Sequence, residues 1–202
     1  MIYDEPTASE KQRILEQRKN KKLVKPQNFK SLKAYLWNCL KHSVTGQSYG
    51  PGTERWLISK SPRLEKDKCK TAGDAKDLIT GDSYEIKFTI ASLDGKTNYV
   101  QIRPHYAASH YFLGAFDPEL DILEFFVISK KDIVSIIAKY GGYAHGSKKT
   151  QGNITKENIT NSSYEYALRP NMKKDIDVSL LALRQANQIN KPEWQWLKTI
   201  TN

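Results

Sequence analysis

Two short runs on either side of a turn constrain the fold more than any other feature of this sequence. Residues 74 to 79 (DAKDLI) and 83 to 90 (SYEIKFTI) flank Thr80-Gly81-Asp82, and the second run alternates between polar and apolar side chains. Alternation with a period of two is typical of a β-strand, and a glycine beside an aspartate is typical of the turn between antiparallel strands. The segment therefore predicts a β-hairpin.

The predicted second strand carries a carboxylate and an ammonium group on one face. Residues two apart project from the same side of a strand, so Glu85 and Lys87 emerge together. The apolar side chains of Tyr84, Ile86 and Phe88 point the other way. One face of this strand is therefore polar, and the other is expected to belong to the core.

The first strand offers two aspartates as the partner of Glu85, and the register of the hairpin decides between them. A two-residue turn would place Leu78 opposite Glu85 and leave Asp74 on the same face as Glu85. A three-residue turn would put Asp77 opposite Glu85 and turn Asp74 away. The sequence leaves both registers open.

Two carboxylates beside a lysine suggest a Mg²⁺ site, because Mg²⁺ prefers a few oxygen ligands and keeps several waters. Such a cation neutralises a phosphate oxygen and activates a water, while an ammonium group orients the nucleophile. The tripeptide acid-x-Lys alone is not diagnostic, because it also occurs at residues 74 to 76 and 94 to 96. The alternative is a solvent-facing Glu/Lys pair, which is common on ordinary strands.

The charge balance favours a polyanionic partner. The chain has 202 residues, 32 of them Lys or Arg and 22 Asp or Glu, for a formal net charge of +10. Between Gln17 and Thr53 there are Lys and Arg residues but no Asp or Glu. This segment forms either a solvated basic face or a surface that contacts phosphates.

Several classes of protein are not supported. Cys39 and Cys69 cannot form a disulfide framework, and no apolar run reaches the roughly 18 residues of a membrane helix. The acidic N-terminus lacks the apolar region of a signal peptide, so we expect a cytoplasmic protein with no membrane contact. The four histidines lack zinc-ligand spacing, and no glycine-rich phosphate-binding motif indicates a nucleotide cofactor.

Hydrophobic periodicity and turn residues predict the other elements. We expect helices over 10–22, 28–42, 54–60, 130–139 and 175–189, and strands over 110–116, 122–128 and 164–170. Residues 48–53 (SYGPGT) predict a loop, and 141–163 predict a long basic loop. Residues 98–103 alternate like a strand but could be helical, so their type stays open. Trp194 and Trp196 are expected to seal a core edge or a subunit contact.

The hairpin resembles the PD-(D/E)xK nucleases, the superfamily that holds most type II restriction endonucleases. The resemblance rests on Gly73-Asp74-Ala75, on Glu85-Ile86-Lys87, and on the following NYVQIRPHY and HYFLGAFD, and it covers about residues 52 to 130. It implies an α/β fold with an αβββαβ core and a central mixed sheet. The single nuclease domain, 1–202, would then comprise a basic helical segment (1–47), a catalytic core (48–140), and a recognition loop with a C-terminal helix (141–202).

The resemblance also implies the roles of individual residues. Asp74 and Glu85 would bind Mg²⁺ with the carbonyl of Ile86, and Lys87 would position the attacking water. The spacing of the family favours Asp74 over Asp77.

Three further positions bear on the resemblance. Glu54 would add a carboxylate from the preceding helix, as in many members, and Gln101 resembles a supporting polar residue after the E-x-K strand. Gly73 replaces the proline of the motif.

The function implied is Mg²⁺-dependent cleavage of double-stranded DNA at a specific sequence, as a homodimer because palindromic DNA matches two-fold symmetry. The candidate DNA-contacting residues are Arg103, His145, Lys148, Lys149, Gln151, Asn153 and Arg169. Two alternatives remain: a repair or nicking nuclease of the same fold, or a non-catalytic basic module that binds nucleic acid.

Overall fold

The computed structural model describes residues 3–16, 25–42, 44–69, 71–145, 151–161, 163–174 and 176–201. The large sheet has five strands, in the order β1 (Leu64–Lys66), β2 (Ala75–Asp77), β3 (Ser83–Ile90), β5 (His110–Asp117) and β6 (Ile122–Ser129). A small antiparallel sheet has the order β4 (Tyr99–Ile102), β8 (Tyr166–Leu168) and β7 (Gly142–Tyr143). The chain is thus an α/β protein.

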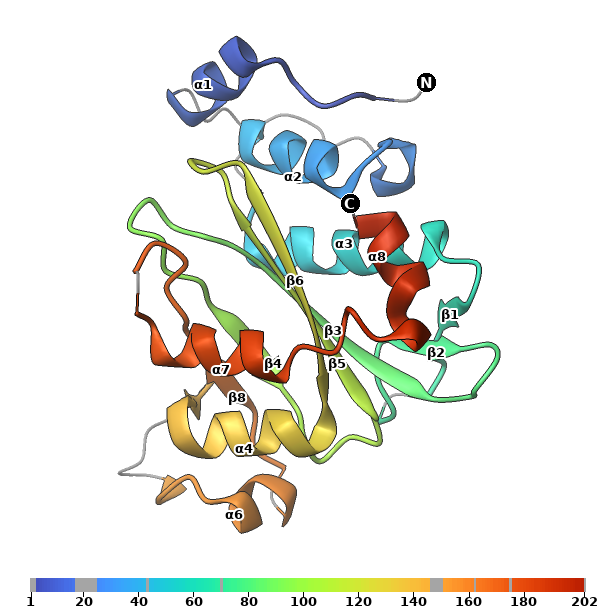
Figure 1. The fold of residues 1–202 in the computed structure, drawn as a ribbon, viewed down its shortest axis with the longest axis vertical. Helices are drawn as coiled ribbons and strands as arrows, with labels where there is room; N and C mark the ends of the chain where they lie inside the picture. The colour runs from blue at the N-terminus through green and yellow to red at the C-terminus, as the bar shows by residue number, and fades with distance from the viewer. Residues whose placement is uncertain are drawn as a thin grey trace.

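Helices lie on both faces of the large sheet (Figure 1). The α-helices in the described ranges are α1 (Ala8–Glu16), α2 (Leu32–Lys41), α3 (Gly46–Lys60), α4 (Lys130–Tyr140), α6 (Lys156–Asn161), α7 (Val178–Ala186) and α8 (Gln195–Thr201). None of those in the described ranges has the length and apolar character needed to cross a membrane. A capping box precedes α1, since the Glu10 carboxylate accepts the main-chain N–H of Thr7 at 2.9 Å.

The large sheet is mixed, as expected. Strand β3 pairs in parallel with β5, whereas the β1/β2, β2/β3 and β5/β6 pairs are antiparallel. The predicted strands at 110–116 and 122–128 are confirmed as β5 and β6, which pair as an antiparallel hairpin. Alternation along β5 divides the core, with Phe112 and Phe116 on one face and Tyr111 and Leu113 on the other.

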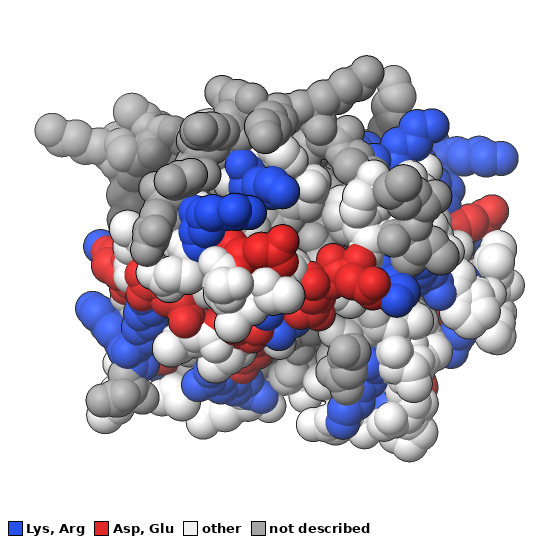
Figure 2. All heavy atoms as spheres, turned by 90° about the horizontal axis from the view of Figure 1, so that it is seen from above, with Lys and Arg blue, Asp and Glu red and all other residues white. Residues whose placement is uncertain are grey.

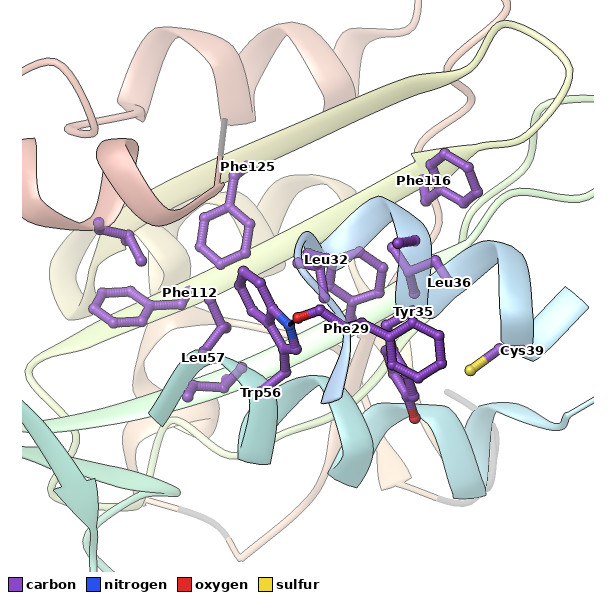
Figure 3. Close-up of a cluster of buried hydrophobic side chains, with 14 of the residues drawn as sticks. Phe29, Leu32, Tyr35, Leu36, Cys39, Trp56, Leu57, Phe112, Phe116 and Phe125 are labelled. Atoms are coloured by element: carbon purple, nitrogen blue, oxygen red, sulfur yellow. Dashed lines mark hydrogen bonds between the residues drawn. The ribbon is translucent and has the colours of Figure 1, made fainter. Parts of the chain in front are cut away.

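The first core lies between the sheet and helices α2 and α3. Figure 3 shows ten labelled residues of this core: Phe29, Leu32, Tyr35, Leu36, Cys39, Trp56, Leu57, Phe112, Phe116 and Phe125. Burying each large side chain of this kind contributes about 1.5–3 kcal/mol. This packing fixes α3 beside β3, where the Tyr49 hydroxyl accepts the main-chain N–H of Ile90 at 3.2 Å.

The prediction of a loop at SYGPGT was wrong, because these residues lie inside α3. A Cβ atom at Gly52 would lie 1.8 Å from the hydroxyl oxygen of Tyr35 in α2. Glycine therefore permits the close contact of the two helices, although it weakens an isolated helix. Tertiary packing outweighs local propensity here, and the expected helix at 54–60 is the second half of a longer one.

The predicted loop at 141–163 was wrong in part. Strand β7 and helix α6 interrupt it, and α6 is anchored by the fully buried Ile159. An isolated apolar residue gives no periodic signal, which explains the error.

Several other predicted elements are confirmed. The predicted helix at 130–139 is α4, and a strand is present within 164–170. Residues 98–103, whose type the sequence left open, contain strand β4. Trp194 is buried against the rings of Tyr84, His110 and Phe112, so it seals a core edge as expected.

The described part of the predicted 10–22 helix belongs to α1, and residues 17–22 lie outside the described residues. Two other predicted helices are shorter in the structure. The helix expected at 28–42 is α2, which begins at Leu32. The predicted helix at 175–189 begins only at Val178, because the Asp177 carboxylate caps the N–H groups of Ser179 and Leu180.

The expected αβββαβ order is met only in its first part. Helix α3 and strands β1, β2 and β3 follow one another as expected. Residues 91–109, which connect β3 to β5, contain strand β4 where the family pattern has a helix. Pairing of β4 with β8 places this connection in the small sheet.

Candidate active site

The hairpin of β2 and β3 has a longer turn than either predicted register. Ala75 pairs with Tyr84 and Lys76 with Ser83, so both expected pairings with Glu85 were wrong. The Asp77 carboxylate accepts the N–H groups of Ile79 and Thr80, at 2.7 and 3.1 Å, which closes a wider turn. One more step of the observed register places Asp74 opposite Glu85.

Asp77 lies on the opposite face of the hairpin from Glu85. Its side chain has no exposed surface and binds the Arg63 guanidinium at 2.6 Å and the Tyr84 hydroxyl at 3.1 Å. Burial would raise the pKa of Asp77, but the N–H groups of Ile79 and Thr80, with Arg63 and Tyr84, outweigh burial and lower it. Asp77 is therefore part of a structural ion pair and does not face Glu85.

Asp74, Glu85 and Lys87 form one compact polar group. The Lys87 Nζ lies 2.6 Å from Oε1 of Glu85 and 3.2 Å from Oδ2 of Asp74. The Glu85 side chain is 1% exposed, and that of Asp74 is 25% exposed. The group thus extends from the protein interior to a solvent-accessible carboxylate.

Asp74 lies directly before β2 and also forms hydrogen bonds along the edge of β3. The main-chain carbonyl of Tyr84 accepts the N–H of Asp74 at 2.8 Å, and the carboxylate of Asp74 accepts the N–H of Ile86 at 2.8 Å. A residue in a strand directs its N–H and C=O to the same edge, so the carbonyl of Ile86 also faces Asp74. Two carboxylates and one main-chain carbonyl therefore converge at this edge.

The electrostatics of the group couple its members. Burial raises the pKa of Glu85, and the nearby Asp74 adds to this, while Lys87 and Arg103 oppose it. Burial alone would lower the pKa of Lys87, but Glu85 and Asp74 raise it. Lys87 is therefore protonated at neutral pH, and its charge offsets the repulsion between the two carboxylates.

Glu54 lies on α3 close enough to this group to interact with it. Burial raises the pKa of Glu54, and Asp74 raises it further, while Lys66 and Lys87 lower it. Helix α3 thus brings a third carboxylate to the neighbourhood of the hairpin, as expected from its place in the sequence.

The donor set suits a hard cation such as Mg²⁺. Within the ranges that the structure describes, no group of three or more His, Cys, Asp or Glu side chains is placed to hold a metal. Asp74 and Glu85 contribute two carboxylates, and the carbonyl of Ile86 would be the third protein ligand. One or two carboxylates with several retained waters is the usual coordination of Mg²⁺ in proteins. The residues present therefore fit Mg²⁺.

Gly73 allows Asp74 to approach β3. A Cβ atom at position 73 would lie 2.7 Å from the main-chain oxygen of Tyr84 and 2.9 Å from its carbonyl carbon. Neither atom can move without disturbing the sheet, so a larger residue would displace the start of β2. The sequence shows Gly73 only as a departure from the proline of the nuclease motif, and the packing reason is visible only in three dimensions.

Gln101 occupies an irregular position in β4. It is exposed and has a φ of 57°, in the left-handed region that side chains rarely adopt, and the pairing of β4 with β8 shifts between Tyr99 and Ile102. Bulges of this kind recur beside active sites, where they redirect a side chain. The structure gives no contact between Gln101 and the Asp74 group.

Arg103 and His145 share one carboxylate that the sequence analysis missed. The Arg103 Nε lies 2.7 Å from Oε1 of Glu165, and the His145 Nε2 lies 3.4 Å from Oε2 of the same residue. Glu165 thereby links Arg103, which follows β4, to His145, which lies near the start of the segment between β7 and β8. Its place in the alternating YEYALRP was the one available signal.

The remaining candidates for DNA contacts are more scattered. Arg169 and Asn153 are exposed. Gln151 is partly buried, and its main-chain carbonyl accepts the Tyr143 hydroxyl at 3.1 Å. Lys148 and Lys149 lie outside the described residues. No contact in the described part of the chain joins these side chains to the Asp74 group.

The N-terminal face of the molecule is not uniformly basic. Figure 2 shows acidic side chains in a band across this face, with Lys and Arg side chains on both sides. Lys30 pairs with Asp4 at 2.5 Å, and Lys33 with Asp121 at 3.2 Å. Acids from other parts of the chain therefore offset part of the basic segment between Gln17 and Thr53.

No protein-family model matches this chain, and no curated protein matches its sequence. The geometry of the site is therefore the basis on which a function can be proposed for this chain.

Proposed function

We propose that this protein is a Mg²⁺-dependent endonuclease that hydrolyses phosphodiester bonds of double-stranded DNA at a specific sequence, as type II restriction enzymes do. The observation that carries the proposal is the convergence of Asp74, Glu85 and Lys87 on one face of the β2/β3 hairpin. An ordinary surface Glu/Lys pair would be solvated, whereas Glu85 is buried and faces a second carboxylate. Perturbed and coupled ionisable groups of this kind are typical of active sites.

Each residue of the group has a distinct role in the proposal. Asp74, Glu85 and the carbonyl of Ile86 would hold Mg²⁺, which supplies positive charge beside the phosphate and the attacking water. The Lys87 ammonium orients the water and stabilises negative charge that develops on the phosphate. Glu54 and Gln101 would support the site from α3 and β4.

Supporting observations come from the fold and the charge. The order α3, β1, β2, β3 agrees with the first part of the nuclease core that the sequence resembles, and the parallel pairing of β3 with β5 makes the sheet mixed, as expected for that core. The net charge of +10 favours a polyanionic substrate. Arg103, near Glu85, and the segment that follows His145 would contact the DNA backbone and bases, and a homodimer would match a palindromic site.

A cleavage assay on plasmid and phage DNA tests the proposal. With Mg²⁺, a site-specific enzyme yields discrete fragments, a nicking enzyme yields open circles, and a binding module only retards the DNA. We expect discrete fragments from the native protein and none in excess EDTA. The Lys87→Ala variant should bind DNA but not cut it. Unchanged cutting by this variant would remove Lys87 from the reaction.

The two alternatives have different outcomes in the same assay. Open circles alone would favour a repair or nicking enzyme of the same fold. Retarded DNA that stays uncut with Mg²⁺ or Mn²⁺ would favour the non-catalytic module and would contradict the proposed activity.

A further inference from the structure

The ammonium group of Lys87 lies between the carboxylates of Asp74 and Glu85, the two acidic side chains of the site. The Nζ of Lys87 contacts Oε1 of Glu85 at 2.6 Å and Oδ2 of Asp74 at 3.2 Å. These carboxylates come from neighbouring strands and face each other across the hairpin. Lys87 thus neutralises the same oxygens that the proposed function assigns to a metal.

We propose that Lys87 is a built-in counter-cation that a divalent metal must displace, so that metal binding and release of the Lys87 amine are a single exchange. This inference rests on the proposed function only in assuming that Asp74 and Glu85 bind the metal. It adds that metal affinity is reduced by the lysine that later takes part in the reaction.

The hydrogen bonds of Asp74 indicate which donor would leave. Its Oδ2 accepts both the main-chain N–H of Ile86 at 2.8 Å and the ammonium of Lys87 at 3.2 Å. A carboxylate oxygen has two lone-pair directions, so both are in use. The N–H of Ile86 is fixed by the strand, and therefore Lys87 is the donor that can leave.

Binding through the other oxygen of either carboxylate would not avoid the conflict. A divalent ion there would lie within a few ångströms of the ammonium, and two cations repel strongly at a partly buried site. The Lys87 side chain has a flexible four-carbon stem and is 16% exposed, so it has a path toward solvent. Displacement would place its amine beside the site only once the metal is bound.

Calcium binding to the full chain provides the first test, because Ca²⁺ uses oxygen ligands like Mg²⁺. Isothermal titration calorimetry would compare the native protein with Lys87→Met, which keeps the length of the side chain and removes its charge. We expect Lys87→Met to bind Ca²⁺ about tenfold more tightly, which is ~1.4 kcal/mol. The matched control is Lys76→Met, an exposed lysine on β2, which should leave the affinity unchanged.

The outcomes separate this inference from the proposed function. Equal or weaker Ca²⁺ binding by Lys87→Met would overturn the exchange while leaving the metal site intact. Absence of Ca²⁺ binding to every variant, native protein included, would overturn both.

A second measurement uses the native protein and does not depend on the folding of a variant. Acetic anhydride labels exposed, unprotonated lysine amines, and mass spectrometry reports the rate at each position. Lys87 should label slowly without divalent ions and several-fold faster when Ca²⁺ is bound, while Lys76 should not change. A rate at Lys87 that does not rise on Ca²⁺ binding would overturn the exchange.

Discussion

The carboxylate of Asp74 accepts the main-chain N–H of Ile86 at 2.8 Å, so a side chain closes the edge of β3 just before β2 begins. This hydrogen bond fixes Asp74 opposite Glu85, and it directs the carbonyl of Ile86 toward the same place. The residue that would bind the metal is therefore also part of the sheet. Substitution of Asp74 can separate its contribution to metal binding from its contribution to the stability of the sheet.

Asp74→Asn should keep most of the stability, whereas Asp74→Ala should not. The amide oxygen of asparagine can still accept the N–H of Ile86, but alanine leaves that group without its partner, at a cost of about 1–3 kcal/mol. Thermal unfolding followed by circular dichroism should place the alanine variant several degrees below the asparagine variant. Equal melting temperatures would show that the hydrogen bond contributes little.

Asp77→Asn should destabilise the protein without affecting divalent-ion binding, because Asp77 faces Arg63 and Tyr84 on the other side of the hairpin. We expect a loss of about 1–3 kcal/mol at pH 7 in urea unfolding.

The effect of Asp77→Asn should depend on pH. The folded-state pKa of Asp77 is lowered, so its contribution is complete above the ordinary value of 3.8 and is lost as the pH falls through the lower one. The difference between the native protein and the variant should therefore shrink in acid. A constant difference down to pH 2 would contradict the ion pair.

Glu85→Gln should be at least as stable as the native protein when divalent ions are removed. Burial and Asp74 raise the pKa of Glu85, so its favourable contribution is complete below the ordinary pKa of 4.5 and is lost as the pH rises through the higher value. Above that value the ionised carboxylate therefore costs stability, which glutamine avoids. Calorimetric melting in EDTA tests this, and a variant that melts well below the native protein would contradict it.

Gly73→Ala should displace Asp74 and impair both folding and cleavage. The added Cβ would lie 2.7 Å from the main-chain oxygen of Tyr84, and such overpacking costs about 1–3 kcal/mol. We expect cleavage of plasmid DNA to fall by about a hundredfold, since a shift of ~1 Å in a catalytic group has effects of this size.

The control for Gly73→Ala is Gly81→Ala in the turn of the same hairpin. Gly81 has a φ of 77° and open space around its Cα, so alanine there costs about 1–2 kcal/mol of backbone strain without a clash. This variant should retain its cleavage rate. Similar losses of cleavage in the two variants would indicate a general loss of folding rather than a displaced Asp74.

The sequence predicts the hairpin but not its register. Alternation in SYEIKFTI and the Gly81-Asp82 turn signal are local, and the structure confirms both strands. The register depends on the Asp77 carboxylate, which caps the turn, and on Gly73, which lets the chain approach Tyr84. Both are three-dimensional contacts that a pattern of apolar residues does not report.

The helices also show that local sequence patterns do not report three-dimensional contacts. The periodic segments that became α2 and α4 were predicted within a few residues, because each has an apolar face that packs on the sheet. The start of α3 was missed because Gly50, Pro51 and Gly52 read as a loop, while the structure packs Gly52 against Tyr35. Glu165 was missed because its place in the alternating YEYALRP does not by itself distinguish it from a solvated acid.

Cleavage of supercoiled plasmid DNA by the matched pair Asp74→Asn and Asp77→Asn, with Mg²⁺, is the most direct test of the proposed active site. The two substitutions make the same chemical change three residues apart on opposite faces of one hairpin. We predict that Asp77→Asn still converts the plasmid to linear product, at a temperature where it is folded, and that Asp74→Asn does not. Cutting by Asp74→Asn at the native rate would contradict the proposal that Asp74, Glu85 and Lys87 form the active site.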